Sequence, residues 1–135
     1  MAFSARLLNA GPSVLGEHDW INDNFEAVLV GQDHVHSDTH TTYSDISGNF
    51  VANIPLAGKT ISNSTVNNYF DCNDIDFGSL YSGKFIYIVR RAGGALAGTD
   101  LLVSKIDLNA GESGNITVDA ALTVAANGLM NISVV

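Results

Sequence analysis

The residues of this chain best suited to chemistry are three histidines, His34, His36 and His40, accompanied by Asp33 and Asp38. A His-x-His spacing on a strand puts both imidazoles on one face, where their nitrogens can bind zinc or another transition metal. The surrounding residues are polar, which is typical of a loop, and no cysteine is near. We therefore predict a solvated loop and no cofactor, and keep His34, His36 and His40 as weak candidates for a metal site.

A second group of possible metal ligands is acidic and consists of Asp71, Asp74 and Asp76. A twelve-residue EF-hand loop needs glycine at its sixth position and glutamate at its twelfth. Counting from Asp71, those positions hold Asp76 and Ser82, so the EF-hand interpretation fails. An irregular calcium site stays as an alternative. A solvated strand edge, where acidic side chains discourage pairing with other edges, is the prediction.

The sequence contains no strong catalytic signature. Cys72 is the single cysteine, has no activating base beside it, and neighbours carboxylates that would raise the pKa of its thiol. A Gly-x-Ser-x-Gly elbow does not occur, and residues 57–61 lack the first glycine of a phosphate-binding loop. We predict that the protein is not an enzyme.

Composition limits the class of protein. The chain has 135 residues, enough for one compact domain, with 46% hydrophobic and only 15% charged residues. Such a weakly charged surface favours burial in an oligomer or assembly. The net charge of -8 disfavours nucleic-acid binding. No apolar run approaches the roughly 20 residues that span a bilayer, and the first six residues lack the basic-then-apolar run of a signal peptide, so we expect synthesis in a cytosol and no membrane partner.

Several segments are typical of strands. Residues 26–30 and 50–52 are extended in character, and a helical turn is expected at residues 43–46. Residues 84–90 are almost continuously apolar, which predicts a central strand covered on both faces, with residues 100–107 as its antiparallel partner. Asn127-Gly128 predicts a hairpin between residues 115–124 and 129–134.

The N-terminal segment differs from the rest. Gly11-Pro12 interrupts any helix in residues 3–15, so we predict an N-terminal arm or short broken helix over residues 1–18 and a single β-rich domain over residues 19–135. Many short strands separated by Gly and Asn turns predict a mainly β fold, namely an antiparallel β-sandwich or small β-barrel.

A series of short motifs resembles, in its order, a family of small tailed-phage virion proteins. The motifs cover most of the chain from about Leu15 onward: Asp19-Trp20-Ile21-Asn22-Asp23 with residues 25–30, His40 with Tyr43-Ser44-Asp45-Ile46, residues 56–60, 74–77, 85–89 and 101–107, and Gly114-Asn115-Ile116-Thr117-Val118. The chain departs from the family pattern in its interrupted start, in its extra histidines and at Val118.

The resemblance implies a structural role without catalytic residues. Proteins of that family are capsid decoration, or cement, proteins, which bind the outside of the assembled head and stabilise contacts between major capsid subunits. We therefore expect the major capsid protein as partner, a homo-oligomer with a trimer favoured, and a location on the capsid surface of the virion. Trp20, Phe3, Leu7 and Leu8 are the expected interface residues. The alternative is a binding module of the virion surface or tail for a host glycan or a metal ion.

Overall fold

The computed structural model describes residues 4–7, 19–63, 67–110, 112–118 and 130–133. Within these residues the fold is mainly β, and all paired strands are antiparallel, which confirms the predicted fold class. The elements are β1 (Ser4–Leu7), β2 (Asn24–Val30), η1 (Tyr43–Asp45), η2 (Ser47–Asn49), β3 (Phe50–Pro55), β4 (Thr60–Asn63), β5 (Asn67–Asp71), β6 (Tyr81–Gly83), β7 (Phe85–Arg91), β8 (Leu101–Asp107), β9 (Ile116–Val118) and β10 (Met130–Ser133).

The main sheet has five strands in the order β1-β8-β7-β2-β3. β7 is its central strand and pairs with β2 through Val28↔Tyr87 and with β8 through Tyr87↔Lys105. The predicted central position of this segment and its antiparallel pairing with β8 are both confirmed. Because side chains of a strand alternate between the two faces of the sheet, β7 supplies residues to two separate layers.

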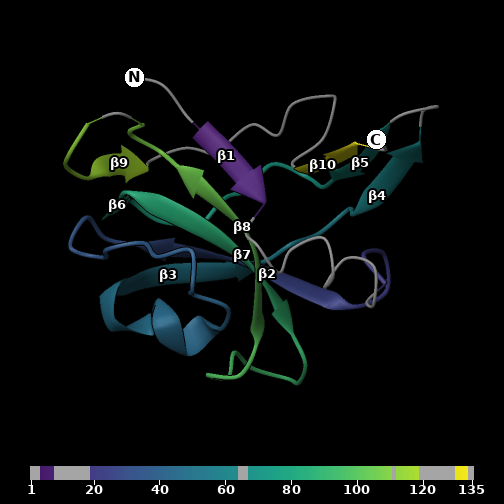
Figure 1. Cartoon of the computed structure of the whole chain (residues 1–135), viewed down its shortest axis with the longest axis horizontal. Coiled ribbons are helices and arrows are strands. Elements are labelled where there is room, and N and C mark those ends of the chain that lie inside the picture. Colours follow the sequence, from purple (N-terminus) through teal and green to yellow (C-terminus); the bar gives the residue numbers. More distant parts are fainter. Residues whose placement is uncertain (1–3, 8–18, 64–66, 111, 119–129, 134–135) are drawn as a thin grey trace.

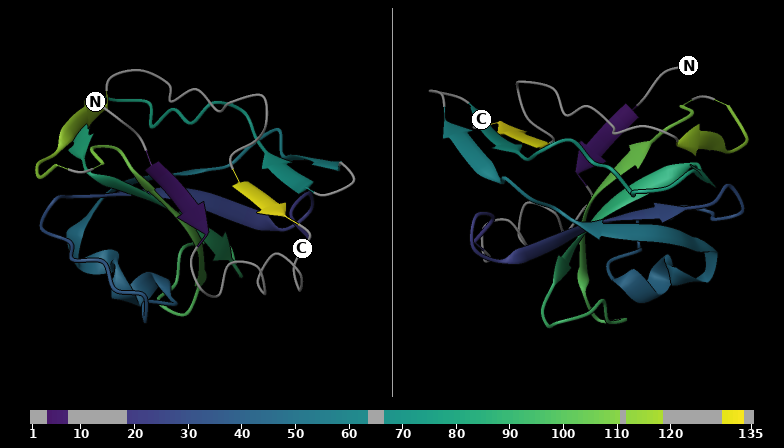
Figure 2. Two further views of the ribbon diagram at one scale, coloured as in Figure 1. Left: turned by 45° about the horizontal axis from the view of Figure 1, so that its top comes forward. Right: turned by 180° about the vertical axis from the view of Figure 1, so that it is seen from behind.

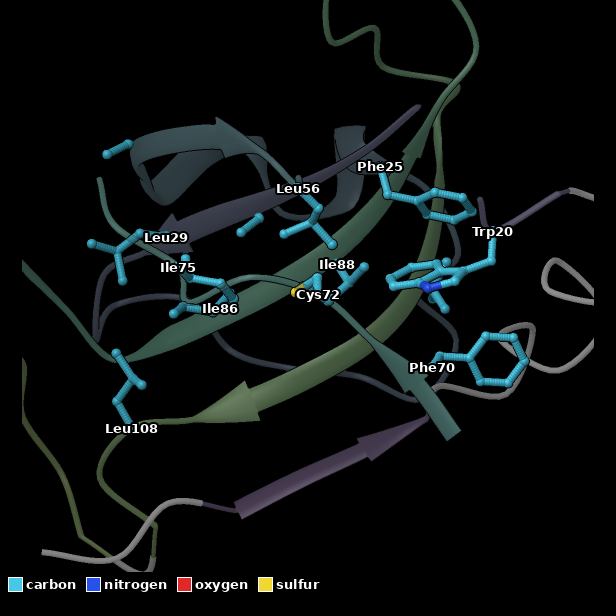
Figure 3. Packing of buried hydrophobic residues seen from close by; sticks show 13 residues of the cluster. Trp20, Phe25, Leu29, Leu56, Phe70, Cys72, Ile75, Ile86, Ile88 and Leu108 are labelled. Carbon is cyan, nitrogen blue, oxygen red and sulfur yellow. The ribbon is translucent and has the colours of Figure 1, made fainter. Parts of the chain in front are cut away.

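One face of the main sheet, called here the core face, carries the larger apolar cluster. Ile86 and Ile88 of β7 lie there beside Trp20, Phe25 and Phe70. The Trp20 ring lies 4.7 Å from that of Phe25 and 5.9 Å from that of Phe70, centroid to centroid (Figure 3). This aromatic group joins the turn before β2 to strand β5, which is far away in the sequence.

The opposite face, called here the loop face, carries a second cluster. Phe85, Tyr87 and Val89 of β7 pack there with Val28 and Val30 of β2, and Ile46 covers them from the helical turns. The helical turn predicted at residues 43–46 is confirmed as η1. Figure 1 shows η1 and η2 on the side of the main sheet away from β4 and β5.

Two small sheets complete the fold. β10, β5 and β4 form a three-stranded sheet, and β6 pairs with β9. Both lie on the same side of the main sheet as seen in Figures 1 and 2, which gives the layered arrangement of a sandwich. Trp20 Nε1 donates hydrogen bonds to the carbonyl oxygens of Thr60 and Asp71, at 3.0 and 3.2 Å, and so ties the main sheet to β4 and β5.

The N-terminal segment contains a strand where we expected a broken helix or an arm. β1 pairs with β8 in the register Ser4↔Asp107 to Leu7↔Ser104, so these four residues are an edge of the main sheet. A free backbone edge on β8 offers hydrogen-bonding groups to any extended segment, and this tertiary pairing outweighs the weak helical pattern of residues 3–15. Residues 8–18 lie outside the described part of the chain.

The predicted C-terminal hairpin is wrong for the strands that the structure describes. β9 pairs with β6, and β10 pairs with β5, so the two segments belong to different sheets. The Asn127-Gly128 turn itself lies outside the described residues. A turn signal reports only local backbone preference, whereas strand partners are selected by the burial of whole faces.

Candidate metal centre

The histidine segment is an extended loop between two turns. The His34 amide donates to the Gly31 carbonyl at 3.2 Å, and the His40 amide donates to the Ser37 carbonyl at 3.0 Å. Between the turns, the side chain of Val35 is 81% exposed, while His34 is buried and His36 half-buried. The alternation expected of His-x-His therefore occurs, although the segment is a loop and no strand.

Tyr87 lies beneath this loop and was missed by the sequence analysis. Its hydroxyl is 2.8 Å from His34 Nε2 and 3.0 Å from His36 Nδ1. The available signal was the period of two in β7, which places Tyr87 on the same face as Phe85 and Val89. Nothing in the sequence indicated that the His loop would cover that face.

Two further contacts orient the imidazoles. His36 Nε2 is 3.3 Å from Asp38 Oδ1, which favours the proton on that nitrogen and leaves the lone pair on Nδ1, towards Tyr87. The Ser37 amide donates to His40 Nδ1 at 3.3 Å. Carboxylate partners of this kind raise the basicity of a histidine and fix its ring in metal sites.

His40 completes the cluster. Its ring centroid lies 5.5 Å from that of His34 and 5.9 Å from that of His36. One ligand nitrogen of each of the three residues lies within 4.8 Å of the other two. Among the described residues, this is the one group of three or more His, Cys, Asp or Glu side chains close enough to hold a metal ion. The structure thus brings together all three of the weak candidates.

The charge state of His34 suits ligation. Burial is the largest cause that lowers the pKa of His34 to about 4, and the electrostatic effects of His40, His36 and Lys105 act in the same direction. The imidazole is therefore neutral at pH 7, which is the form that binds a metal.

The backbone that follows His40 is held in place by the carboxylate of Asp45. Asp45 Oδ2 accepts hydrogen bonds from the amides of Thr41 and Thr42, at 2.9 and 3.0 Å. These bonds lower the pKa of Asp45. The Leu102 amide donates to the Thr41 carbonyl at 2.9 Å, so β8 holds the residue directly after His40 in place.

The acidic group does not form a comparable site in the described structure. Asp71 Oδ1 accepts from the Cys72 amide and Asp76 Oδ1 from the Gly78 amide, both at 2.8 Å, so each caps its own turn. Asp74 and Asp76 are exposed, in line with the predicted solvated edge.

Cys72 is buried in the core face. Burial is the largest cause that raises the pKa of Cys72 to about 11, and Asp71 and Asp74 contribute in the same direction. The predicted direction is confirmed, but the largest cause is burial, which the sequence analysis did not include. A thiol in this state is a poor nucleophile.

The structure places the four expected interface residues differently. Trp20 is only 1% exposed and packs within its own chain, which corrects its prediction as an interface residue. Trp20 is buried because its indole links the main sheet to strands β4 and β5 of the same chain. Leu7 lies in β1. Phe3 and Leu8 lie outside the described residues.

Comparison with protein-family models, with curated proteins and with solved structures finds no match to this chain. In the described part, no helix has the length and apolar character required to cross a membrane.

Proposed function

We propose that this chain is a virion structural protein that decorates the outside of an assembled tailed-phage head. In this role it binds the major capsid protein, as a homo-oligomer with a trimer favoured, and stabilises contacts between capsid subunits. It acts without catalysis on the capsid surface of the virion, after synthesis in the host cytoplasm.

One observation carries the proposal. The motifs that resemble the virion family are spread along the sequence, yet several of them form adjoining parts of the main sheet. Residues 25–30, 85–89 and 101–107 lie in β2, β7 and β8, which are neighbours, and Trp20 anchors β2 to the second sheet. The resemblance therefore concerns residues of the central strands, which supports a similar fold, and the proposed role itself rests on the resemblance in sequence.

The surface is compatible with attachment to a larger assembly. The described chain exposes large apolar side chains at separate places: Ile21, Val35, Phe50, Ile61 and Leu80. A protein with 15% charged residues has few groups whose desolvation would oppose association. A decoration protein stabilises a shell only if it binds the assembled form better than the free subunits.

The test is co-sedimentation of the purified protein with assembled, undecorated heads and, separately, with unassembled capsid protein. Saturable pelleting with heads alone is the expected result, and the plateau gives copies per shell. Sedimentation of the free protein reports its oligomeric state. A protein that never pellets with heads contradicts the proposal.

Residues 3 and 8 allow a sharper test of the N-terminal contact. Deleting the segment would also remove β1 from the sheet edge, so point substitutions are preferable. Phe3→Ser and Leu8→Ser should weaken head binding. Ser79→Ala, at an exposed polar residue that is not one of these apolar side chains, is the control and should leave binding unchanged. Equal losses in all three variants would contradict a specific N-terminal contact.

A second candidate function is a binding module of the virion surface or tail, for a host glycan or a metal ion. The observation in its favour is the gathering of three histidines in a loop at the surface. Failure to bind heads, combined with binding of one of these ligands, would favour this second candidate.

A further inference from the structure

We infer that His34, His36 and His40 together bind one divalent transition-metal ion, with Zn²⁺ as the best match. This inference deepens the second candidate function and does not depend on the decoration role. It rests on the positions of the three imidazoles, the groups that orient them and the residue types that are present.

The ligand chemistry selects the class of metal. Three imidazoles with no thiolate and no converging carboxylates suit Zn²⁺, Cu²⁺, Ni²⁺ or Co²⁺, whereas Ca²⁺ and Mg²⁺ prefer oxygen ligands. Three histidines plus one open position is the ligand set of several zinc sites. The cluster therefore offers three protein ligands and leaves a coordination position for water or another ligand.

The distances require only a modest adjustment. Nitrogens that share a tetrahedral Zn²⁺ at about 2.0–2.1 Å lie about 3.3 Å from one another. Here the three ligand nitrogens lie within 4.8 Å of one another. His36 and His40 are half-buried, so a small rotation of their rings towards the buried His34 disturbs less packing than a movement of His34 would.

The site is already organised without a metal. The Tyr87 hydroxyl lies 2.8 Å from His34 Nε2 and 3.0 Å from His36 Nδ1, so these two nitrogens face the same oxygen atom, and a bound metal replaces this hydroxyl as their partner. Asp38 orients His36 from the other ring nitrogen, at 3.3 Å. Exchange between tautomers in water puts the lone pair of each neutral imidazole on the nitrogen that faces the metal, and for His40 this replaces the hydrogen bond that Nδ1 accepts from the Ser37 amide. Preorganisation of this kind lowers the entropic cost of binding.

The surroundings both favour and oppose a cation. Asp38 contributes a carboxylate at the rim, and the chain as a whole carries a net charge of -8. Two ammonium groups near Phe85, which itself contacts His34, oppose a cation: Lys84, 4.6 Å from the Phe85 ring centroid and paired with Asp107, and Lys105, 5.3 Å from that centroid. Lys105→Gln should therefore strengthen metal binding.

The experiment uses the full chain without a histidine tag, stripped of metal by a chelator. Zn²⁺ binding is measured by calorimetry, and Co²⁺ binding by the visible absorption that tetrahedral cobalt acquires. One ion per chain is expected, together with a rise in melting temperature. His36→Ala and His40→Ala should each weaken binding at least about tenfold and abolish the tetrahedral cobalt spectrum.

His18→Ala is the matched control, because His18 is the one histidine outside the cluster in the sequence. It should bind as the wild type does. His36 and His40 are chosen because they are less buried than His34, and circular dichroism confirms that the variants fold. Absence of binding by the wild type, or equal losses in all three variants, would overturn the inference. Head binding is scored separately, so the two proposals fail independently.

Discussion

The two faces of β7 are built from one run of residues, Phe85–Arg91, but they are covered in different ways. Ile86 and Ile88 meet other apolar side chains of the core face, including the aromatic group around Trp20. Tyr87, between them in sequence, lies on the loop face and directs its hydroxyl to two histidines. One face thus supplies most of the packing, while the other combines packing with a polar cluster.

The difference shows how a small sheet can carry a site. A central strand whose side chains are all buried from Phe85 to Val89 has little backbone freedom, and a hydroxyl on such a strand is therefore held firmly. The ligands come from a loop, whose backbone is free to adopt the required geometry. The rigid face positions Tyr87, and the loop brings the three histidines to it.

The largest expected effect lies on the core face. Trp20→Ala removes the indole that contacts Phe25 and Phe70 and donates to the Thr60 and Asp71 carbonyls. It should lower the free energy of unfolding by about 3–5 kcal/mol. Urea denaturation followed by circular dichroism measures the loss. A loss below about 1 kcal/mol would contradict the role of Trp20 as the link between the sheets.

The next largest effect is expected on the reactivity of the Cys72 thiol, which is buried in the core face. With its pKa near 11 in place of 9.0, Cys72 should carry about a hundredfold less thiolate at pH 8. Alkylation by iodoacetamide at pH 8 should be at least about a hundredfold slower in the folded than in the denaturant-unfolded protein. Because the shift is upward, the folded-state rate should keep rising with pH up to about 11. Equal rates in the two states would contradict the burial of this thiol.

The smallest effect is expected on the loop face. Tyr87→Phe keeps the packing of the ring but removes the hydroxyl that contacts His34 and His36. In the metal-free protein it should cost about 1–3 kcal/mol of stability, because a ring nitrogen of buried His34 and one of half-buried His36 lose a hydrogen-bonding partner. Chemical denaturation in the presence of a chelator gives the value. A cost as large as that of Trp20→Ala would remove the distinction between the two faces.

Much of the main sheet could be predicted from local pattern. The apolar run at residues 84–90 indicated a central strand, and its partner at residues 100–107 was found, since both signals depend on alternation and composition within one segment. The pairing of β1 with β8 and of β10 with β5 could not be predicted. These pairings join segments roughly 100 and 60 residues apart, and only the energetics of the whole chain select them.

The histidine cluster, too, could be predicted from the sequence only in part. The sequence by itself determined the ligand types, the His-x-His alternation and the neutral or acidic character of the neighbouring residues. Only the tertiary structure decided that His40 folds back onto His34 and His36, that His34 is buried, and that the hydroxyl of Tyr87 lies beneath them. The physical reason is that the pattern of side chains is a local property of the backbone. Which face covers which loop depends on the packing of segments that are distant in the sequence.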